Sequence, residues 1–598
     1  MEHVIVSPRM AYGKLDSSRP APPADEQTIP SGRRRRRFVL IGLLAALFLA
    51  ASAASIAVLA RSRARSKGPS LAGPRPSEAI SRTCRLTRYP ELCVSSLLDF
   101  PGATDAAERD LVHISVNVTL RRVGRAVYGA SAIVGVPMDT HARAAYEDCM
   151  ELLDSSMDQL SRSLSIIQPS STSLQPKGTS DEDVLTWLSA ALTNHDTCSE
   201  GLDGVADGYV KEQMQSHVKD LTELASNCLA IFAASSRNQD FSGIPIENKK
   251  RKLLSTTTTM TTSGFPRWVE TGDRRLLQMA ATGIQADMVV AKDGSGGYTR
   301  IGDAVKAAAE SSPRRIIIYV KAGRYEENIK VGRKKTNLMF IGDGKDKTVV
   351  SGFRSVADGY TTFHTATFAA TGAGFIMKDM TIENLAGPEK HQAVALRVGA
   401  DRAVVYSCSI TGYQDTLYVH SQRQFYRECD VSGTVDFVFG NAAVVLQRCS
   451  LWARRPMAAQ KNTITAQNRK DPNQNTGISI HGCKVLAAPD LDWGANPTYL
   501  GRPWKMYSRT VYMMSYMGGH VDPAGWLEWN GDFALDTLYY GEYMNYGPGA
   551  GVAKRVTWPG YRVIKLAEEA SKFTVAKFIR GSSWLPSTGV AFLAGLSA

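Results

Sequence analysis

A loose repeat in the second half of the sequence most constrains the fold. Segments of one shape recur there: Met377-Lys-Asp-Met-Thr-Ile, Tyr406-Ser-Cys-Ser-Ile-Thr, Tyr426-Arg-Glu-Cys-Asp-Val, Leu446-Gln-Arg-Cys-Ser-Leu and Ile480-His-Gly-Cys-Lys-Val. If Asp379, Cys408, Cys429, Cys449 and Cys483 are equivalent, the repeat advances by 29, 21, 20 and 34 residues. Such steps, with short strands and no helix between them, predict a parallel β-helix with stacked coils. An antiparallel sandwich is the alternative, but it would need tight hairpins, and few Asn-Gly or Asp-Gly pairs occur.

Stacking would bring chemically active side chains together. Gln392 and Gln414 are 22 residues apart, and Asp415 and Asp436 are 21 apart. Residues one coil apart in a parallel sheet lie about 4.8 Å from each other. We therefore expect two carboxylates and two primary amides to share one exposed sheet face. Such a cluster is a candidate functional site.

The region 78–232 has a helical pattern. Apolar residues recur at three- and four-residue spacing, as in Tyr146, Met150, Leu153, Met157, Leu160 and Leu164, and in Val184, Trp187, Leu188, Ala191 and Leu192. Asp181 is a plausible helix N-cap. The pattern predicts an up-down four-helix bundle.

The bundle region contains five of the nine cysteines. Cys84 and Cys93 flank a short turn, whereas Cys149 and Cys198 lie on separate helical segments. Two disulfides, one local and one interhelical, with Cys228 free, is one of several allowed connectivities.

The N-terminus predicts a membrane anchor. Residues 33–37 are five arginines, and 38–60 form an uncharged, mostly apolar run of 23 residues. This length suits a transmembrane signal anchor that follows a cytoplasmic basic tail at 1–37 and precedes a linker at 61–77. Everything beyond would be luminal or extracellular, where disulfides are allowed and Asn117, in an Asn-Val-Thr sequon, is a glycosylation candidate.

A second linker is expected at 233–277. Its composition is polar and basic, with a threonine-rich stretch, so it cannot bury enough apolar surface to order itself. Two basic-basic-Leu-Leu sites end at Leu254 and Leu277. They look like processing-protease targets, although a merely solvated charged linker is the alternative.

The net charge and the absence of two motifs reduce the number of functional classes that fit the sequence. The region 278–598 contains 37 Lys and Arg against 27 Asp and Glu, so it carries +10 of the chain's +13. A basic surface favours acidic partners such as an anionic polysaccharide, and the absence of interleaved aromatic motifs disfavours nucleic acid. The sequence has no Gly-x-Ser-x-Gly and no His-Glu-x-x-His, so it predicts neither a serine-elbow esterase nor a zinc site. We expect no metal and no cofactor.

Five ordered motifs resemble a known family. They are Gly323-Arg-Tyr-Glu-Glu327, Gln392-Ala-Val-Ala-Leu-Arg397, Tyr413-Gln-Asp-Thr-Leu-Tyr418, Asp436-Phe-Val-Phe-Gly440 and Leu500-Gly-Arg-Pro-Trp504. They look like the signature blocks of plant pectin methylesterases, over 287–590. The cysteine spacing of 78–232 resembles the plant invertase and pectin methylesterase inhibitor family. The whole chain is thus similar to a zymogen, with an all-β right-handed parallel β-helix at 278–598 behind an inhibitor-like pro-region and an anchor.

The resemblance implies a mechanism. The substrate would be methyl-esterified homogalacturonan, and the products would be a free carboxylate and methanol. Asp436 would be the nucleophile, and Gln392 and Gln414 would stabilise the oxyanion. Asp415, protonated at first, would serve as acid and then as base, while Arg502 would hold Asp436 ionised.

The resemblance also implies partners and further residues. Trp504 would offer a flat face to a sugar ring, and Thr362 matches another substrate-contact position. Partners would include inhibitor proteins, either the chain's own pro-region or separate ones, and a subtilisin-like protease. The mature enzyme would act in the plant cell wall or apoplast.

One further disulfide is expected. Stacking places Cys408, Cys429, Cys449 and Cys483 in one ladder with Cα atoms inside bridging range, so several pairings compete. The family resemblance favours Cys429–Cys449.

Two other functions remain alternatives: a β-helical polysaccharide lyase, and a non-enzymatic, inhibitor-type wall protein.

Overall fold

The computed structural model describes residues 76–167, 180–235 and 285–596. The expected anchor at 38–60 and both basic-Leu-Leu sites lie outside these ranges. Within them, no helix is both long and apolar enough to cross a membrane.

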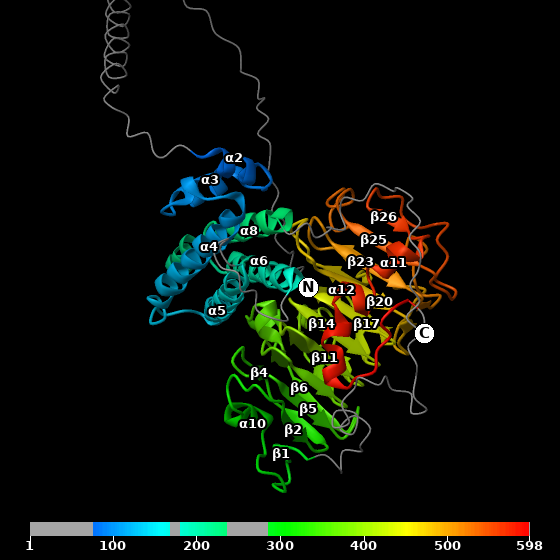
Figure 1. The fold of residues 1–598 in the computed structure, drawn as a ribbon. Coiled ribbons are helices and arrows are strands. Elements are labelled where there is room, and N and C mark those ends of the chain that lie inside the picture. The colour runs from blue at the N-terminus through cyan, green and yellow to red at the C-terminus, as the bar shows by residue number, and fades with distance from the viewer. Residues whose placement is uncertain (1–75, 168–179, 236–284, 597–598) are drawn as a thin grey trace, which may run out of the picture. The chain divides into compact units, whose positions relative to one another are not determined.

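The first described region is helical (Figure 1). Its helices are α2 (Glu78–Arg85), α3 (Pro90–Leu98), α4 (Glu108–Ser131), α5 (Thr140–Ile166), α6 (Asp181–Asp203), α7 (Tyr209–Val218) and α8 (Leu221–Ser235). The longer helices α4, α5, α6 and α8 contact one another in a closed ring of pairs, which is the arrangement of a four-helix bundle. Helix α6 is capped by Ser180, in a capping box with Asp183, rather than by Asp181, which is its first residue.

The two bundle disulfides form as expected. Cys84 on α2 is bonded to Cys93 on α3 across the short turn between these helices, and Cys149 on α5 is bonded to Cys198 on α6. Cys228 is buried and free, with its Sγ 3.0 Å from the Thr119 hydroxyl. The Asn117 sequon lies in the middle of α4 and not in a surface loop. Asn117 is half-buried there, and Thr119 is 1% exposed. Glycosylation of Asn117 stays a prediction.

The second described region consists of three parallel sheets. The eleven-stranded sheet contains β1 (Met288–Val290), β2 (Ile316–Val320), β5 (Leu338–Gly342), β8 (Ile376–Lys378), β11 (Ala403–Tyr406), β14 (Arg423–Arg427), β17 (Ala443–Gln447), β20 (Gly477–His481), β23 (Arg509–Met513), β25 (Tyr539–Tyr543) and β26 (Tyr561–Val563). The eight-stranded sheet contains β3 (Gly323–Glu326), β6 (Thr348–Gly352), β9 (Thr381–Asn384), β12 (Ser409–Thr411), β15 (Asp430–Gly433), β18 (Ser450–Ala453), β21 (Lys484–Ala487) and β24 (Tyr516–Met517). The seven-stranded sheet contains β4 (Ile329–Val331), β7 (Phe368–Ala370), β10 (Leu396–Val398), β13 (Leu417–Val419), β16 (Val438–Gly440), β19 (Asn462–Gln467) and β22 (Thr498–Pro503).

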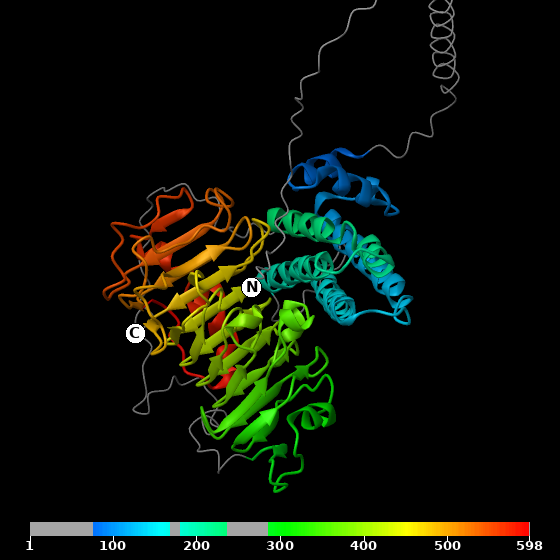
Figure 2. The ribbon, with the colours of Figure 1, turned by 180° about the vertical axis from the view of Figure 1, so that it is seen from behind.

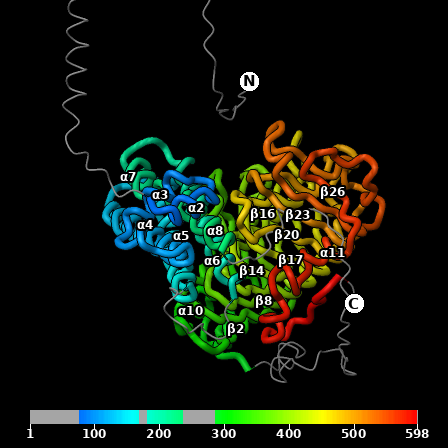
Figure 3. Tube along the Cα trace, turned by 45° about the horizontal axis from the view of Figure 1, so that its top comes forward, coloured from blue at the N-terminus to red at the C-terminus, as the bar shows by residue number. Residues whose placement is uncertain are grey.

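From β2 to β22, each coil contributes one strand to each sheet, which makes the region a parallel β-helix. The chain advances from green through yellow to orange along the stack of coils (Figures 2 and 3). Smaller elements attached to it are α10 (Ile301–Ala307), α11 (Ala567–Ser571) and α12 (Val575–Phe578), and the 3₁₀ turns Val356–Asp358, Thr362–Thr365, Pro388–Lys390, Gly581–Ser583 and Leu585–Thr588. The predicted parallel β-helix is thereby confirmed, and the alternative antiparallel sandwich is excluded for this region.

The strand register corrects the repeat by one residue. Ser409 pairs with Thr381, so Cys408 is equivalent to Met380 and not to Asp379. Cys408, Cys429, Cys449 and Cys483 each immediately precede a strand of the eight-stranded sheet and face the core of the β-helix.

The expected Cys429–Cys449 disulfide is wrong, because all four ladder cysteines are free. Cys429 and Cys449 are equivalent residues of neighbouring coils, so their side chains point in the same direction into the core and stay as far apart as the neighbouring strands. A disulfide needs Cβ atoms that are closer, about 3.8 Å apart. Each thiol contacts a backbone carbonyl instead: Cys429 Sγ lies 3.3 Å from the oxygen of Arg427, and Cys449 Sγ lies 3.6 Å from that of Gln447.

The β-helix has a hydrophobic core of its own. The buried side chains inside the coils all come from residues 290–540. Outside the coils, the C-terminal segment around α12 packs on the outer face of the eleven-stranded sheet, against residues such as Val445 and Phe425. A region that encloses its own core folds independently, so we expect a 278–598 fragment to fold without the bundle.

Candidate active site

The two aspartates occupy the same place in consecutive coils. Asp415 and Asp436 each lie two residues before a strand of the seven-stranded sheet, and those strands pair Leu417 with Val438. Both have left-handed backbone conformations, with φ of 62° at Asp415 and 53° at Asp436. Such conformations cost free energy for residues other than glycine, although aspartate tolerates them better than most. They turn both carboxyl groups out of the sheet at one corner.

All seven predicted substrate and catalytic residues line one cavity of about 450 Å³: Thr362, Gln392, Gln414, Asp415, Asp436, Arg502 and Trp504. The predicted clustering is therefore present, whereas the roles of the individual residues stay predictions.

Asp436 is held by two side chains. Arg502 donates from Nε to Oδ1 (2.9 Å) and from Nη2 to Oδ2 (2.7 Å), a bidentate ion pair. The Thr463 hydroxyl donates a third hydrogen bond to Oδ1 at 2.6 Å and accepts one from the Asp436 N–H at 2.9 Å. This network fixes the orientation of the carboxylate within the cavity.

Asp415 lacks such compensation. Its side chain is buried, at 8% exposure, and burial followed by the negative charge of Asp436 raises its pKa well above the ordinary range. Arg502 opposes this shift only in part. The pair is therefore divided into one arginine-bound carboxylate and one carboxyl group that favours its protonated form.

Aromatic side chains complete the cavity. Tyr418 and Phe439 stack with ring centroids 4.2 Å apart, and Phe439 lies 6.0 Å from Trp504. Arg502 lies over Trp529 at 4.4 Å. Sequence reasoning missed Tyr418, Phe439, Thr463 and Trp529. Only the first two carried a signal, since each follows its aspartate by three residues.

Helices of the bundle contribute to the same cavity. His141, Ala145, Asp148, Thr197, Cys198, Glu200, Gly201 and Gly204 also line it. Asp148 accepts from the Thr361 hydroxyl and lies 3.0 Å from His364 Nδ1, and Thr197 lies 3.0 Å from His420 Nε2. The aspartates were expected on an exposed face. That expectation is wrong for the full chain, because Asp415 and Asp436 are only 8% and 5% exposed beneath the bundle.

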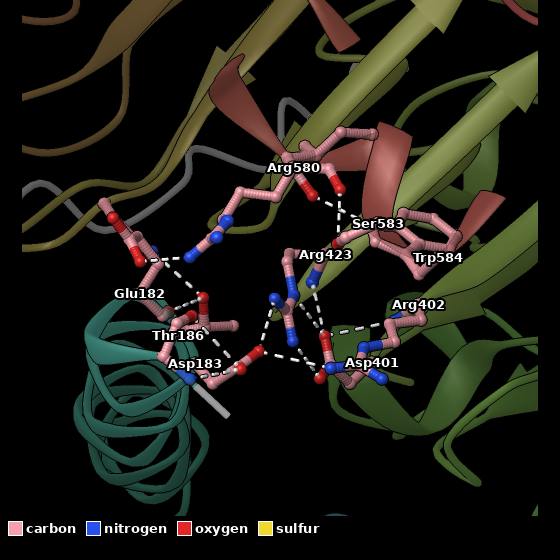
Figure 4. A network of polar contacts seen from close by, with 12 residues as sticks. Glu182, Asp183, Thr186, Asp401, Arg402, Arg423, Arg580, Ser583 and Trp584 are labelled. Carbon is pink, nitrogen blue, oxygen red and sulfur yellow. Dashed lines mark hydrogen bonds and ion pairs between the residues drawn. The ribbon is translucent and has the colours of Figure 1, made fainter. Parts of the chain in front are cut away.

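Charged contacts extend beyond the cavity. Asp196 and Glu200 of α6 pair with Lys470 and Lys505, respectively. At the start of α6, the carboxylate of Asp183 lies 2.7 Å from Arg423, which also makes a bidentate pair with Asp401 (Figure 4). Both groups of contacts place bundle carboxylates against cations of the β-helix.

Fold and site together define a parallel β-helix protein with two neighbouring aspartates, one of them bound by an arginine, in a cavity that is covered by a helical bundle. Residues 287–582 match the family model "Pectinesterase", and 78–231 match "Plant invertase/pectin methylesterase inhibitor". The chain belongs to the pectinesterase family, in the form that carries an inhibitor-like region.

Relatives of full length support this assignment. "Probable pectinesterase/pectinesterase inhibitor 34" of Arabidopsis thaliana is 61% identical over 93% of this chain and 92% of its own length. "Probable pectinesterase/pectinesterase inhibitor 61" of the same plant is 58% identical over 98% of this chain and 100% of its own. The solved "Pectin methylesterase from Carrot" is 55% identical, with a TM-score of 0.52, and covers 52% of this chain and 99% of its own.

Proposed function

We propose that the chain hydrolyses the C6 methyl esters of homogalacturonan through an aspartyl acyl-enzyme and that its bundle restrains this activity. The observation that carries the mechanism is the division of the aspartate pair, with Asp436 bound by Arg502 and Asp415 favouring the protonated form. Family membership favours this activity over a β-helical lyase or a non-enzymatic wall protein.

In the first step, an oxygen of Asp436 attacks the ester carbonyl carbon and forms an anhydride-type acyl-enzyme. Side-chain N–H groups of Gln392 and Gln414 stabilise the oxyanion. Asp415 gives its proton to the departing methoxide, which leaves as methanol. Asp415 then takes a proton from water, whose oxygen attacks the acyl carbon. This releases the free galacturonate carboxylate and restores both aspartates.

The first test of this function is methanol release from esterified pectin by the 278–598 fragment. We expect methanol in equal amount to new carboxylate, which acidifies the medium. An unsaturated uronic product would support the lyase alternative, and no product from a folded fragment would support the non-enzymatic one.

Thr463→Val should lower kcat by roughly ten- to 150-fold with little change in KM. The substitution preserves shape but removes the hydroxyl that donates to Asp436 Oδ1 at 2.6 Å, and loss of a hydrogen bond to a charged group costs ~1.5–3 kcal/mol. The measurement is kcat and KM of the fragment, with Thr411→Val on the eight-stranded sheet as control. An unchanged kcat would contradict a positioning role for Thr463.

The bundle is suited to block the substrate. Eight of its residues line the same cavity as the aspartates, and its Asp183 and Asp196 pair with cations of the β-helix. A tethered inhibitor acts at a high effective concentration, so modest affinity suffices. Release of the bundle from the active site would need cleavage of the chain between the bundle and the β-helix.

Restraint by the bundle should weaken as pH rises from about 4.5 to about 7. Burial, followed by the charge of Asp196, raises the pKa of Glu200 from 4.5 to about 7. A carboxyl group whose pKa is higher in the closed state than in the open state stabilises the closed state while it is protonated. This stabilisation is complete below the pKa of the open state and is lost as the pH rises through the pKa of the closed state. Each pKa unit is a factor of about ten in the closing equilibrium.

The measurement is the activity of the full chain divided by that of the 278–598 fragment at each pH, which cancels the pH dependence of catalysis. Glu200→Gln should flatten the ratio between pH 4.5 and 7. A steep ratio that persists in this variant would assign the pH dependence to another group.

We further propose that residues 38–60 anchor the chain in the secretory pathway and that a subtilisin-like protease cuts near Leu254 or Leu277. The five arginines before the apolar run and the two basic-Leu-Leu sites support this. N-terminal sequencing of wall-extracted protein should then begin near Ser255 or Gln278. Separate inhibitor proteins of the bundle's family would bind the surface that the bundle leaves.

A further inference from the structure

One row of side chains crosses the outer face of the seven-stranded sheet. In register, it consists of Lys330, Ala369, Arg397, Tyr418, Phe439, Ala466 and Arg502. The neighbours of Lys330 and of Arg397 along their strands are buried in the coil interior, so both cations point outward. Arg397 lies four strands from Arg502, which at 4.7–4.9 Å per strand is roughly 19 Å. The stacked Tyr418 and Phe439 form an apolar surface between them.

A single bundle carboxylate bridges the two cations at the far end of the row. Glu151 Oε2 lies 2.6 Å from Lys330 Nζ, and its Oε1 lies 3.5 Å from Arg397 Nη1. Ala369, between the two cations in the row, has a small side chain. The two positive charges lower the pKa of Glu151 even though burial by itself raises it. This end of the row therefore holds a carboxylate.

Glu151 fits Arg397 incompletely. Arg397 is 3% exposed, and within the described part of the chain its Nε and Nη1 make no hydrogen bond; nor does Glu151 Oε1. The guanidinium is fixed over the Phe363 ring, with Cζ 3.3 Å from the ring centroid. Buried donors without acceptors cost free energy, so Arg397 is preorganised for a better-placed carboxylate than the helix supplies.

We propose that Lys330 and Arg397 form a binding subsite for the free carboxylate of a de-esterified galacturonate residue, and that Glu151 occupies this subsite in the full chain. The inference rests on the proposed function, since the polysaccharide would run from Asp436 over Tyr418 and Phe439 to this subsite. This subsite makes the enzyme prefer polysaccharide chains that already carry free carboxylates some distance from the ester that reacts. The bundle carboxylate then imitates the product of the reaction.

The test compares the 278–598 fragment with its Lys330→Gln and Arg397→Gln variants on fully esterified and on half-esterified homogalacturonan of equal length. Loss of one charged contact should raise KM on the half-esterified polymer about tenfold, equal to ~1.4 kcal/mol, with kcat unchanged. KM on the fully esterified polymer should change little. Lys484→Gln, an exposed cation on the eight-stranded sheet, removes the same charge elsewhere and should leave both values unchanged.

Equal KM increases on both polymers, or an unchanged KM on the half-esterified one, would overturn the subsite and leave Glu151 as a contact of the bundle only. If Arg397→Gln melts early, Lys330→Gln decides, because its side chain is 58% exposed in the full chain and its loss removes little packing. No methanol from the unmodified, folded fragment would instead overturn the proposed function.

Discussion

Replacing Asp436 by asparagine is expected to abolish methanol release. A neutral amide is a very poor nucleophile towards an ester, so no acyl-enzyme would form. Asparagine has nearly the same size and tolerates the left-handed backbone that this position requires, with φ of 53°. The measurement is methanol release by the 278–598 fragment, together with a thermal melt. Near-normal activity with an unchanged melt would remove Asp436 from the mechanism.

Two variants complete this experiment. Asp415→Asn should lose proton transfer, which contributes about 10²- to 10⁴-fold, and so should retain more activity than Asp436→Asn, especially on esters whose leaving group needs no proton. Asp401→Asn is the matched control, because Asp401 also makes a bidentate pair with an arginine, Arg423, but does not line the active-site cavity. It should lower the melting temperature and leave the chemistry intact.

The second large effect is expected from removal of the bundle. The full chain should release methanol at least a hundredfold more slowly than the 278–598 fragment, since a tether supplies a roughly millimolar effective concentration and micromolar affinity would keep ~99.9% of the sites closed. Asp196→Lys in the full chain should recover at least tenfold, because a lysine there would repel Lys470 and Lys505.

The control for this experiment is Glu212→Lys, the same change of charge at an exposed position of α7 in the same bundle. It should leave the full chain restrained. If the full chain and the fragment are equally active, the bundle does not act as an inhibitor of its own β-helix.

Much of the site could be predicted from the sequence, because a β-helix converts sequence spacing into proximity. Asp415 and Asp436, 21 residues apart, do lie in equivalent places of consecutive coils. The spacing rule has a tolerance of about one residue, however. It matched Cys408 with Asp379 although the register pairs it with Met380, and it could not say that the ladder thiols point in parallel.

What the sequence by itself determined is local: the residue types, their periodicity and the order of the coils, together with the cysteine spacing that allowed the two bundle disulfides. The spacing of residues could not show which carboxylate is bound by an arginine, because Arg502 comes from a coil 66 residues beyond Asp436. The family resemblance implied this pair, and the tertiary structure contains it. Only the tertiary structure decided that Thr463 orients Asp436 and that α5 and α6 bury both aspartates. Such contacts depend on side-chain directions and on desolvation, and neither can be predicted from the spacing of residues along one chain.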